Sequence, residues 1–265
     1  MEKGNLITLS LITKKIKEKK EFSGISNSLI DEELEKYLRK HKISLDRLTI
    51  SDIKIISKEI RASLRYYTGQ YQKSVKDRSK LLNEGNIEKL LQTHSSTAER
   101  ISFYPVLKRR IEDLSVKSIL DIGCGLNPLA LANPKIKYFA SDIKEDELNI
   151  ISTFFKKNNI KGKTFVYDLR KSNISLPSID LSLLLKVLDV ALKNKHKTAE
   201  KLLLKLPSKY IIVSFSTRKL SGKPMNHPSR IWFERILSRI NYPYEVFNSD
   251  NEIFYLIRKL ELTKK

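Results

Sequence analysis

Three aspartates follow apolar runs of the chain at spacings that could place them around one ligand. Asp121, Asp142 and Asp168 each end a run rich in β-forming residues. The loop Gly123-Cys124-Gly125 comes directly after the first run, and glycine lets backbone N–H groups approach a ligand closely. The carboxyl ends of parallel strands share one edge of a sheet, so we expect these residues to meet there. The pattern predicts a nucleoside site.

The form of the loop indicates which nucleoside it would hold. A dinucleotide fingerprint, Gly-x-Gly-x-x-Gly, would need a third glycine where the chain has Pro128. The Asp-x-Gly-x-Gly form instead favours S-adenosylmethionine as the cofactor. Asp142 is placed to accept hydrogen bonds from both ribose hydroxyls, and Asp168 to face the adenine amino group. The alternative interpretation of the two glycines alone is an ordinary strand-to-helix turn.

Cysteine and histidine carry no predicted chemistry in this chain. No basic neighbour that would lower the pKa of Cys124 can be assigned, so we interpret it as a small loop residue and not a nucleophile. His41, His94, His196 and His227 lack the spacing of metal ligands and are interpreted as surface or capping residues, so no metal site is predicted. A single cysteine excludes an internal disulfide and suits a reducing compartment.

The elements that must position the aspartates change in kind near residue 116. Before it the chain has helical patterns; after it, short β-rich runs alternate with helical ones, which predicts a mostly parallel sheet with helices on both faces. The run 252–258 is expected to form a hairpin with 244–247 at the sheet edge. The other β-rich runs are 117–122, 136–142, 163–168, 179–186 and 210–216, and the helical candidates lie near 145–157, 196–205 and 229–240.

Helix-start signals organise the first 115 residues. Ser28 is predicted to cap a helix over 29–40, and Ser51 a helix from 52 to about 67 that ends at Gly69. Another helical stretch is expected over 72–82, followed by a turn at 83–85. Ser96-Thr97-Ala98-Glu99 has the form of a capping box, and Pro105 is expected to bend the helix that follows.

The net charge of +21 at pH 7 is spread over both halves of the chain. A field of this strength favours a polyanionic partner such as nucleic acid. The alternative is a lysine- and isoleucine-rich proteome, in which many basic proteins bind nothing. No run approaches the ~20 apolar residues of a membrane span, and the N-terminus has no signal-peptide cleavage pattern. We therefore expect a cytoplasmic protein that does not enter membranes.

Several segments together resemble one family, the 16S rRNA (guanine-1405-N7) methyltransferases that confer aminoglycoside resistance. Among them are His94-Ser95-Ser96-Thr97-Ala98-Glu99-Arg100 and Asn251-Glu252-Ile253-Phe254-Tyr255-Leu256-Ile257. The resemblance covers about residues 55–260 in the same order, and the segments are specific only as a set. The full set is 64–71, a weaker match, then 94–100, 121–131, 184–186, 213–223, 232–234 and 251–257.

The resemblance implies an α/β fold of the class I S-adenosylmethionine-dependent methyltransferase type. Such a fold is Rossmann-like, with a mostly parallel seven-stranded sheet over 116–265 behind a helical RNA-docking domain over 1–115. Arg100 would bind the methionine carboxylate, Asp142 the ribose, and Leu185 and Lys186 would border the target pocket. The other cofactor-binding residues implied are Gly123, Gly125, Asn127, Ile143, Asp168 and Leu169, and the RNA-binding residues are Arg218, Lys219 and Lys223.

The function implied is methylation of guanine N7 in small-subunit ribosomal RNA at the decoding site, with aminoglycoside resistance as its consequence. N7 carries a free lone pair, so no catalytic acid or base is expected. The substrate would be the 30S subunit or its RNA, and the protein would act as a monomer. One alternative is a basic RNA-binding or ribosome-assembly protein that keeps the fold without turnover. Another is a methyltransferase for a small molecule or protein, against which the basic helical region argues. The chain departs from the family at 132–134, Asp189 and 224–228, near the target side.

Overall fold

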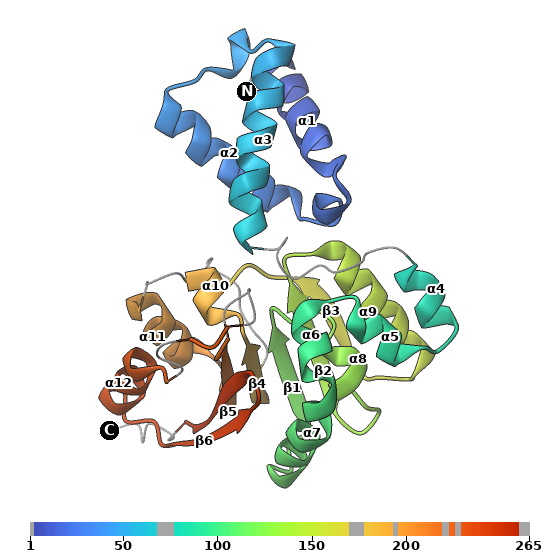
Figure 1. The fold of residues 1–265 in the computed structure, drawn as a ribbon, viewed down its shortest axis with the longest axis vertical. Coiled ribbons are helices and arrows are strands. Elements are labelled where there is room, and N and C mark those ends of the chain that lie inside the picture. Colours follow the sequence, from blue (N-terminus) through green and yellow to red (C-terminus); the bar gives the residue numbers. More distant parts are fainter. Residues whose placement is uncertain are drawn as a thin grey trace.

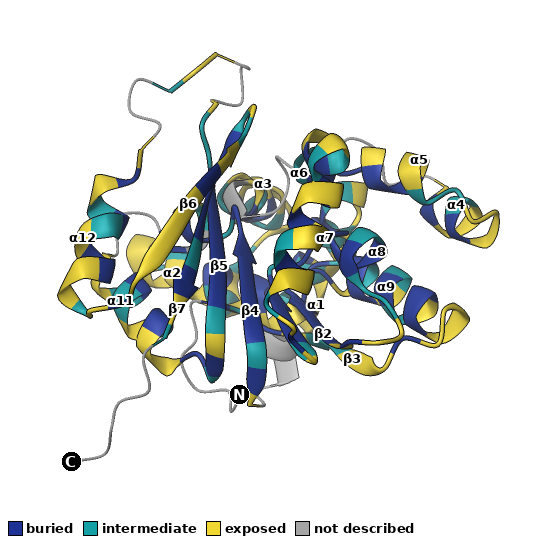
Figure 2. Ribbon diagram, turned by 90° about the horizontal axis from the view of Figure 1, so that it is seen from below, coloured by how far each residue is buried: buried dark blue, intermediate teal, exposed yellow. Residues whose placement is uncertain are grey.

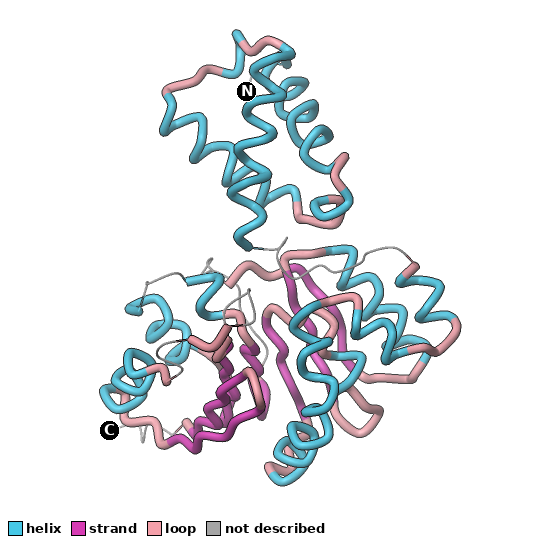
Figure 3. The backbone as a smooth tube through the Cα atoms, viewed as in Figure 1, coloured by secondary structure: helices cyan, strands magenta, loops and turns pink. Residues whose placement is uncertain are grey.

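The chain forms a helical lobe that stands on an α/β domain (Figure 1). The computed structural model describes residues 3–67, 77–169, 178–192, 196–218, 223–225 and 229–259. Figure 3 shows the strands gathered in one sheet of the lower part, with no strand in the upper lobe among the residues described. Within these ranges, every helix is too short or too polar to cross a lipid bilayer.

A seven-stranded, mostly parallel sheet forms the centre of the α/β domain, as predicted. The strand order is β3-β2-β1-β4-β5-β7-β6; β7 pairs antiparallel with both β5 and β6, and the other neighbouring strands are parallel. The predicted hairpin is also confirmed: β6 forms the edge, and β7 lies between it and β5. The strands are β1 Ser118–Ile122, β2 Lys137–Asp142, β3 Gly162–Val166, β4 Ile179–Leu185, β5 Ser208–Ser216, β6 Tyr244–Ser249 and β7 Glu252–Arg258.

Helices cover both faces of the sheet, because buried apolar side chains alternate between the two sides of each central strand. Ile119 of β1 joins the core on one face and Leu120 the core on the other. Figure 2 shows β4 and β5 buried and the edge strand β6 largely exposed. The first face carries α4 Arg78–Asn83, α5 Ile87–Gln92, α7 Tyr104–Asp113, α8 Pro128–Leu131 and α9 Glu145–Lys157; the second carries α10 Leu188–Leu192, α11 His196–Lys205 and α12 Ile231–Arg239.

The upper lobe has a hydrophobic core of its own. It consists of α1 Lys3–Lys17, α2 Asn27–His41 and α3 Ile50–Tyr67, with the short 3-10 helices Lys20–Phe22 and Leu45–Arg47. The later helices α4, α5 and α7 instead share a core with the sheet. The lobe meets the sheet domain where Ile25 pairs with Lys144, and Ile143 packs against the lobe core.

Two predicted helix starts in the upper lobe were wrong by two residues each. Ser26, and not Ser28, occupies the N-cap of α2. Thr49 replaces Ser51 before α3: its N–H donates to Asp52 Oδ2 at 2.9 Å, and the Asp52 N–H donates to Thr49 Oγ1 at 3.2 Å. This reciprocal pair is a capping box, which satisfies two N–H groups that the helix cannot pair internally.

The capping box predicted at Ser96 does not form. Helix α6, Ser95–Arg100, begins one residue earlier, and Thr97 Oγ1 donates to the carbonyls of Leu91 and His94 instead. Pro105 does not bend this helix either; it stands in the first turn of the separate helix α7, where its missing N–H costs nothing. The turn at 83–85 is present, while Gly69 and the first part of the predicted 72–82 helix lie outside the described residues.

Candidate cofactor site

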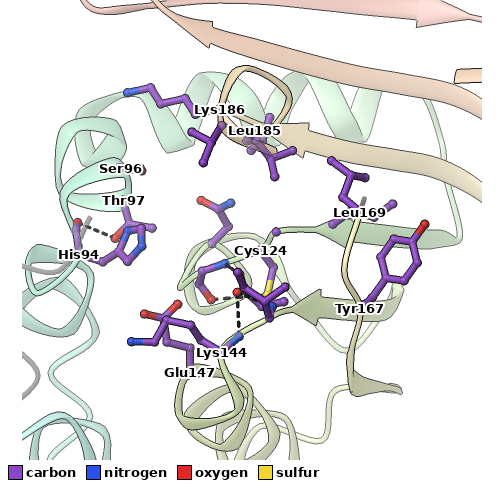
Figure 4. Close-up of a pocket in the computed structure, with 18 of the residues that line it drawn as sticks. His94, Ser96, Thr97, Cys124, Lys144, Glu147, Tyr167, Leu169, Leu185 and Lys186 are labelled. Carbon is purple, nitrogen blue, oxygen red and sulfur yellow. Dashed lines mark hydrogen bonds between the residues drawn. The ribbon is translucent and has the colours of Figure 1, made fainter. Parts of the chain in front are cut away.

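A pocket opens at the carboxyl edge of the sheet, between β1 and β4, where the strand order reverses. Figure 4 shows Tyr167 and Leu169 on one side, His94 and Thr97 on the other, and Leu185 where β4 ends. Such a switch point is the usual ligand site of an open α/β sheet. The structure brings every predicted cofactor and target-pocket residue to its lining: Arg100, Gly123, Gly125, Asn127, Asp142, Ile143, Asp168, Leu169, Leu185 and Lys186.

The loop after β1 adopts a backbone that favours glycine. Gly123 has φ +65° and Gly125 φ +48°, both in the left-handed region. A Cβ on Gly123 would lie 2.6 Å from Val187 Cγ2, and one on Gly125 would lie 3.3 Å from the His94 ring. The loop therefore needs glycine for its conformation, and Gly123 also for its close packing beside the pocket.

Replacing Gly123 with alanine is expected to weaken cofactor binding at least tenfold, because the added methyl group displaces the pocket-lining Val187. Gly85→Ala is the matched control, since Gly85 has φ +72° but no atom within 4 Å of a built Cβ. Both variants carry the left-handed backbone cost of roughly 1–2 kcal/mol. Calorimetric titration of both should show the binding loss only at position 123. Equal losses, or none, would contradict this account of the loop.

Asp142, at the end of β2, anchors the glycine loop. Its Oδ2 accepts the Gly125 N–H at 2.9 Å, and its Oδ1 accepts the N–H groups of Ile143 at 2.7 Å and Lys144 at 3.1 Å. Burial, followed by the nearby Glu147 carboxylate, raises the pKa of Asp142 to about 6, although these three hydrogen bonds lower it. A carboxylate held in this way keeps lone pairs for a ligand in a fixed direction.

Arg100 reaches the pocket from α6 and is almost completely buried. Its Nε and Nη2 donate to the two oxygens of Glu252 at 3.1 and 2.7 Å, and its Nη1 donates to Asn127 Oδ1 at 2.6 Å. Burial tends to lower the pKa of Arg100, but the Glu252 carboxylate outweighs it and the net direction is upward. The guanidinium is therefore a fixed positive charge in the pocket wall.

Glu252 is a residue that the sequence analysis did not single out. It is fully buried, opens β7, accepts hydrogen bonds from Arg100 and Ser214, and lies 3.5 Å from Lys186 Nζ. It stands 152 positions beyond Arg100, so only the folded sheet brings the two together. The one signal in the sequence was its place in the segment 251–257 of the family resemblance.

Lys186 lies at the pocket with its charge already compensated. It has φ +58°, and its Nζ lies 2.6 Å from Glu99 Oε2 and 3.5 Å from Glu252. Its backbone N–H is held by the carbonyl and hydroxyl oxygens of Ser214, both at 3.1 Å. Lys186 lines the pocket, and its role beside a target stays a prediction; its ammonium group is engaged by two carboxylates.

Asp121 does not line the pocket, which corrects the expectation that three aspartates surround the ligand. Strand alternation turns its side chain to the same face of the sheet as Ile119, where Tyr138 Oη donates to Oδ2 at 2.9 Å. Burial raises its pKa to about 7, although the Tyr138 hydrogen bond and the Arg100 charge lower it. Asp121 belongs to the support beneath the loop.

The pocket wall also contains Cys124 and His94, for which the sequence predictions had different outcomes. Cys124 is buried, and burial raises the pKa of its thiol, so it is no thiolate nucleophile, in agreement with the sequence interpretation. His94 was interpreted as a surface or capping residue. It does occupy the N-cap position of α6, although its side chain makes no cap hydrogen bond, but the surface placement is wrong, because His94 is buried and lines the pocket. Burial is the largest influence on its pKa, which falls to about 4, so the ring is neutral at pH 7.

Two of the predicted RNA-binding residues, Arg218 and Lys223, are described by the structure and are not part of the pocket lining. Arg218 follows β5 and pairs with Pro224 in an isolated antiparallel bridge, and Lys223 is exposed beside it. Lys219 lies outside the described residues.

The sheet topology, the glycine loop after β1 and the aspartate after β2 together define a class I methyltransferase. More narrowly, the chain belongs to the ribosomal RNA methyltransferase (FmrO) family, whose sequence profile matches residues 79–255. The resemblance found in the sequence is thereby confirmed.

Individual relatives agree with this assignment. The chain is 31% identical over 207 residues to a 16S rRNA (guanine(1405)-N(7))-methyltransferase of Serratia marcescens, covering 75% of this chain and 81% of the relative. The 16S rRNA methylase ArmA is 30% identical, with a TM-score of 0.57 over 71% of this chain and all of ArmA. The 16S rRNA methyltransferase RmtF, solved with S-adenosyl-L-homocysteine, is 22% identical and shares the fold, with a TM-score of 0.79 over 98% of this chain and all of RmtF.

Proposed function

We propose that this protein transfers a methyl group from S-adenosylmethionine to N7 of a guanine in 16S ribosomal RNA, at the decoding site, and so confers aminoglycoside resistance. The observation that carries the proposal is the pocket, in which Asp142, the glycine loop and a fixed Arg100 charge surround a space at the switch point of the sheet. The named reaction of the 31% identical Serratia relative supports the choice of substrate.

The residues present fit this cofactor at both of its ends. Asp142 would accept hydrogen bonds from the ribose, with Ile143 beside it. Arg100 and Asn127 would hold the methionine carboxylate, because a guanidinium fixed in a buried wall suits an anionic group. Asp168 and Leu169, on the side where Figure 4 shows Leu169, would hold the adenine. Bound here, S-adenosylmethionine supplies a sulfonium methyl group that is open to attack by a nucleophile.

The chemistry needs alignment rather than proton transfer. The N7 lone pair forms the new N–C bond while the C–S bond breaks and sulfur keeps the electron pair, so no proton has to leave. The side chains nearest the target agree with this: His94 is neutral, and Lys186 is held between Glu99 and Glu252. Holding the base in line within a pocket that excludes water would supply the acceleration.

The rest of the chain would position the RNA. Arg218, Lys219 and Lys223 would contact phosphates near the pocket, and binding would weaken with salt as counterions return. We assign the docking role predicted for 1–115 to α1–α3, because α4, α5 and α7 share the core of the sheet. The target base would have to leave its stack, at a cost of a few kcal/mol that these contacts offset. A cytoplasmic monomer without a metal fits this role.

The test is transfer of labelled methyl groups from S-adenosylmethionine to 30S subunits and to naked 16S RNA. Chemical cleavage at N7-methylguanine, followed by primer extension, would then map the modified position. Absence of transfer to both substrates contradicts the proposal. RNA binding without cofactor binding would favour the alternative of a non-catalytic ribosome-assembly protein, which calorimetry distinguishes directly.

Cofactor affinity is expected to fall below about pH 6. The ionised form of Asp142 accepts ribose hydrogen bonds, and its pKa is raised to about 6, so protons compete with the ligand below that value. One proton taken up per site gives about a tenfold loss per pH unit, from 1.4 kcal/mol per tenfold. Titration from pH 5 to 8 should show this slope, while Asp142→Asn should bind weakly at every pH. A flat profile for the unmodified protein would contradict the assignment.

A further inference from the structure

Two segments that depart from the family pattern meet at one buried arginine. Arg230, the N-cap residue of α12, is almost fully buried although it carries a charge. Its Nη2 donates to Asp189 Oδ2 at 3.0 Å and to the Ser216 carbonyl at 2.9 Å, and lies 3.5 Å from Met225 Sδ. Three parts of the chain, namely α10, the end of β5 and the segment 223–225, are therefore joined through one guanidinium group.

The partner Asp189 stands on a helix that borders the pocket. Its neighbours Val187 and Val190 both line the pocket, and α10 also contacts α3 of the helical lobe. Figure 1 shows α10 close to the lower end of α3. A group fixed to Asp189 is therefore fixed relative to the pocket wall and to the lobe at the same time.

The other partners belong to the part of the chain that carries the predicted RNA contacts. Thr217 and Arg218 pair with Met225 and Pro224: the Met225 N–H donates to the Thr217 carbonyl at 2.9 Å, and Arg218 bridges Pro224. Ser216 Oγ also donates to the Arg218 carbonyl at 2.7 Å. Arg218 and Lys223 thus follow and precede two residues, Ser216 and Met225, that Arg230 contacts. These contacts orient the backbone from which the side chains of Arg218 and Lys223 extend into solvent.

We propose that Arg230 is a positioning residue that sets the distance between the RNA-contacting segment at Arg218 and Lys223 and the target pocket beside α10. This inference rests on the proposed function and names how that site matches its ribosomal RNA substrate. Arginine suits the task because its planar group donates to Asp189 and to a carbonyl at once, which a lysine ammonium does with less fixed geometry. The guanidinium also stacks over Phe215, with 5.3 Å to the ring centroid.

The positioning role of Arg230 differs from a contribution of its charge to the stability of the protein. Asp189 is 43% exposed, so the ion pair by itself contributes little to stability. What the arginine adds is a common anchor for parts of the chain that must keep their spacing while RNA binds. Its loss should therefore change affinity for the 30S subunit far more than affinity for the cofactor, because neither Arg230 nor its partners Asp189 and Ser216 line the pocket.

The test compares Arg230→Met with Arg239→Met. The two residues stand at opposite ends of α12, and each substitution removes one positive charge and one ion pair, but Arg239 is 58% exposed and pairs with Glu200 of α11 on the surface. We expect Arg230→Met to raise the Kd for 30S subunits and the KM for them at least tenfold. Its kcat and its cofactor Kd should stay within about threefold of the unmodified protein, and Arg239→Met should change all four values less than threefold.

Asp189→Asn supplies a second measurement, because Asp189 is 43% exposed and its substitution leaves the buried Arg230 side chain in place. We expect it to raise the 30S Kd about threefold, and the double variant with Arg230→Met to be no worse than Arg230→Met alone, because the two residues act through one contact. Arg230→Lys should lie between the unmodified protein and Arg230→Met. If Arg230→Met does not fold, the effects of Asp189→Asn and Arg230→Lys decide the question.

Three results would overturn the inference: 30S affinity equal in Arg230→Met and Arg239→Met, parallel loss of cofactor affinity, or additive effects of the two positions. Measuring the Kd for 30S subunits distinguishes failure of the Arg230 inference from failure of the proposed function. If the unmodified protein binds 30S subunits without methylating them, the proposed function fails while the Arg230 comparison still gives its answer. If methylation proceeds equally in all variants, only the inference fails.

Discussion

Replacing Asp142 with alanine is expected to raise the Kd for S-adenosylmethionine at least 100-fold. The change removes the acceptor that we propose for the ribose hydroxyls and also releases the Gly125 N–H, which Asp142 holds at 2.9 Å. Losing two hydrogen bonds to a charged group amounts to about 3 kcal/mol. Since 1.4 kcal/mol is a tenfold change, the loss corresponds to about 100-fold in affinity. Isothermal titration calorimetry measures it directly.

Asp180→Ala is the matched control for this variant. Asp180 also holds backbone groups with its carboxylate, accepting the N–H groups of Lys117 and Ser118 at 2.8 and 2.9 Å. It stands at the opposite end of the sheet and does not line the pocket. We expect it to lose stability without losing cofactor affinity. Unchanged binding in Asp142→Ala, or equal weakening in both variants, would remove Asp142 from the cofactor site.

The second large effect is expected from Glu252→Gln. Glutamine keeps the shape of the side chain but leaves the buried guanidinium of Arg100 without a countercharge and turns an amide N–H toward one of its donors. Breaking a buried ion pair from one side costs about 3–5 kcal/mol. At about 2–4 °C per kcal/mol for a protein of this size, the melting temperature should fall by roughly 10 °C. Cofactor affinity should fall as well, because Arg100 loses its fixed direction.

Glu245→Gln is the control, since Glu245 pairs with Arg110 at 2.6 Å on the surface. The side chains of that pair are 37% and 52% exposed, so its loss should cost less than about 1 kcal/mol. Thermal unfolding and calorimetric titration of both variants measure the difference. A melting temperature that is equally affected by both changes would show that the Arg100–Glu252 pair does not hold the pocket wall.

The sequence was sufficient for the parts of this protein that depend on local patterns. Alternating β-rich and helical runs predicted the mostly parallel sheet and its antiparallel hairpin, and both are present. The glycine loop and the aspartate of the next run were placed correctly at one pocket, because strands in a parallel sheet end at a common edge. Helix starts were less reliable: Thr49 and Ser26 cap where Ser51 and Ser28 were expected, since several neighbouring side chains are equally able to cap.

The directions in which side chains point, and their contacts with distant parts of the chain, were decided only by the tertiary structure. Asp121 and Asp142 look alike in the sequence, but strand alternation turns Asp121 toward Tyr138 and away from the ligand space. His94 looked like a surface residue, yet packing against Gly125 buries it. No local pattern distinguishes these outcomes, because each depends on neighbours from distant parts of the chain.

The sequence by itself therefore determined the fold class and the loop that would hold a nucleoside, because glycines, strand-end acids and hydrophobic periodicity act over a few neighbouring residues. The family came from the resemblance of several segments over residues 55–260, taken as a set. Only the tertiary structure decided which partners the buried charges meet: Glu252 for Arg100, and Asp189 with the Ser216 carbonyl for Arg230. The physical reason is that a buried charge must be compensated by whichever partner the sheet brings within reach. For Arg100 that partner stands 152 positions along the chain.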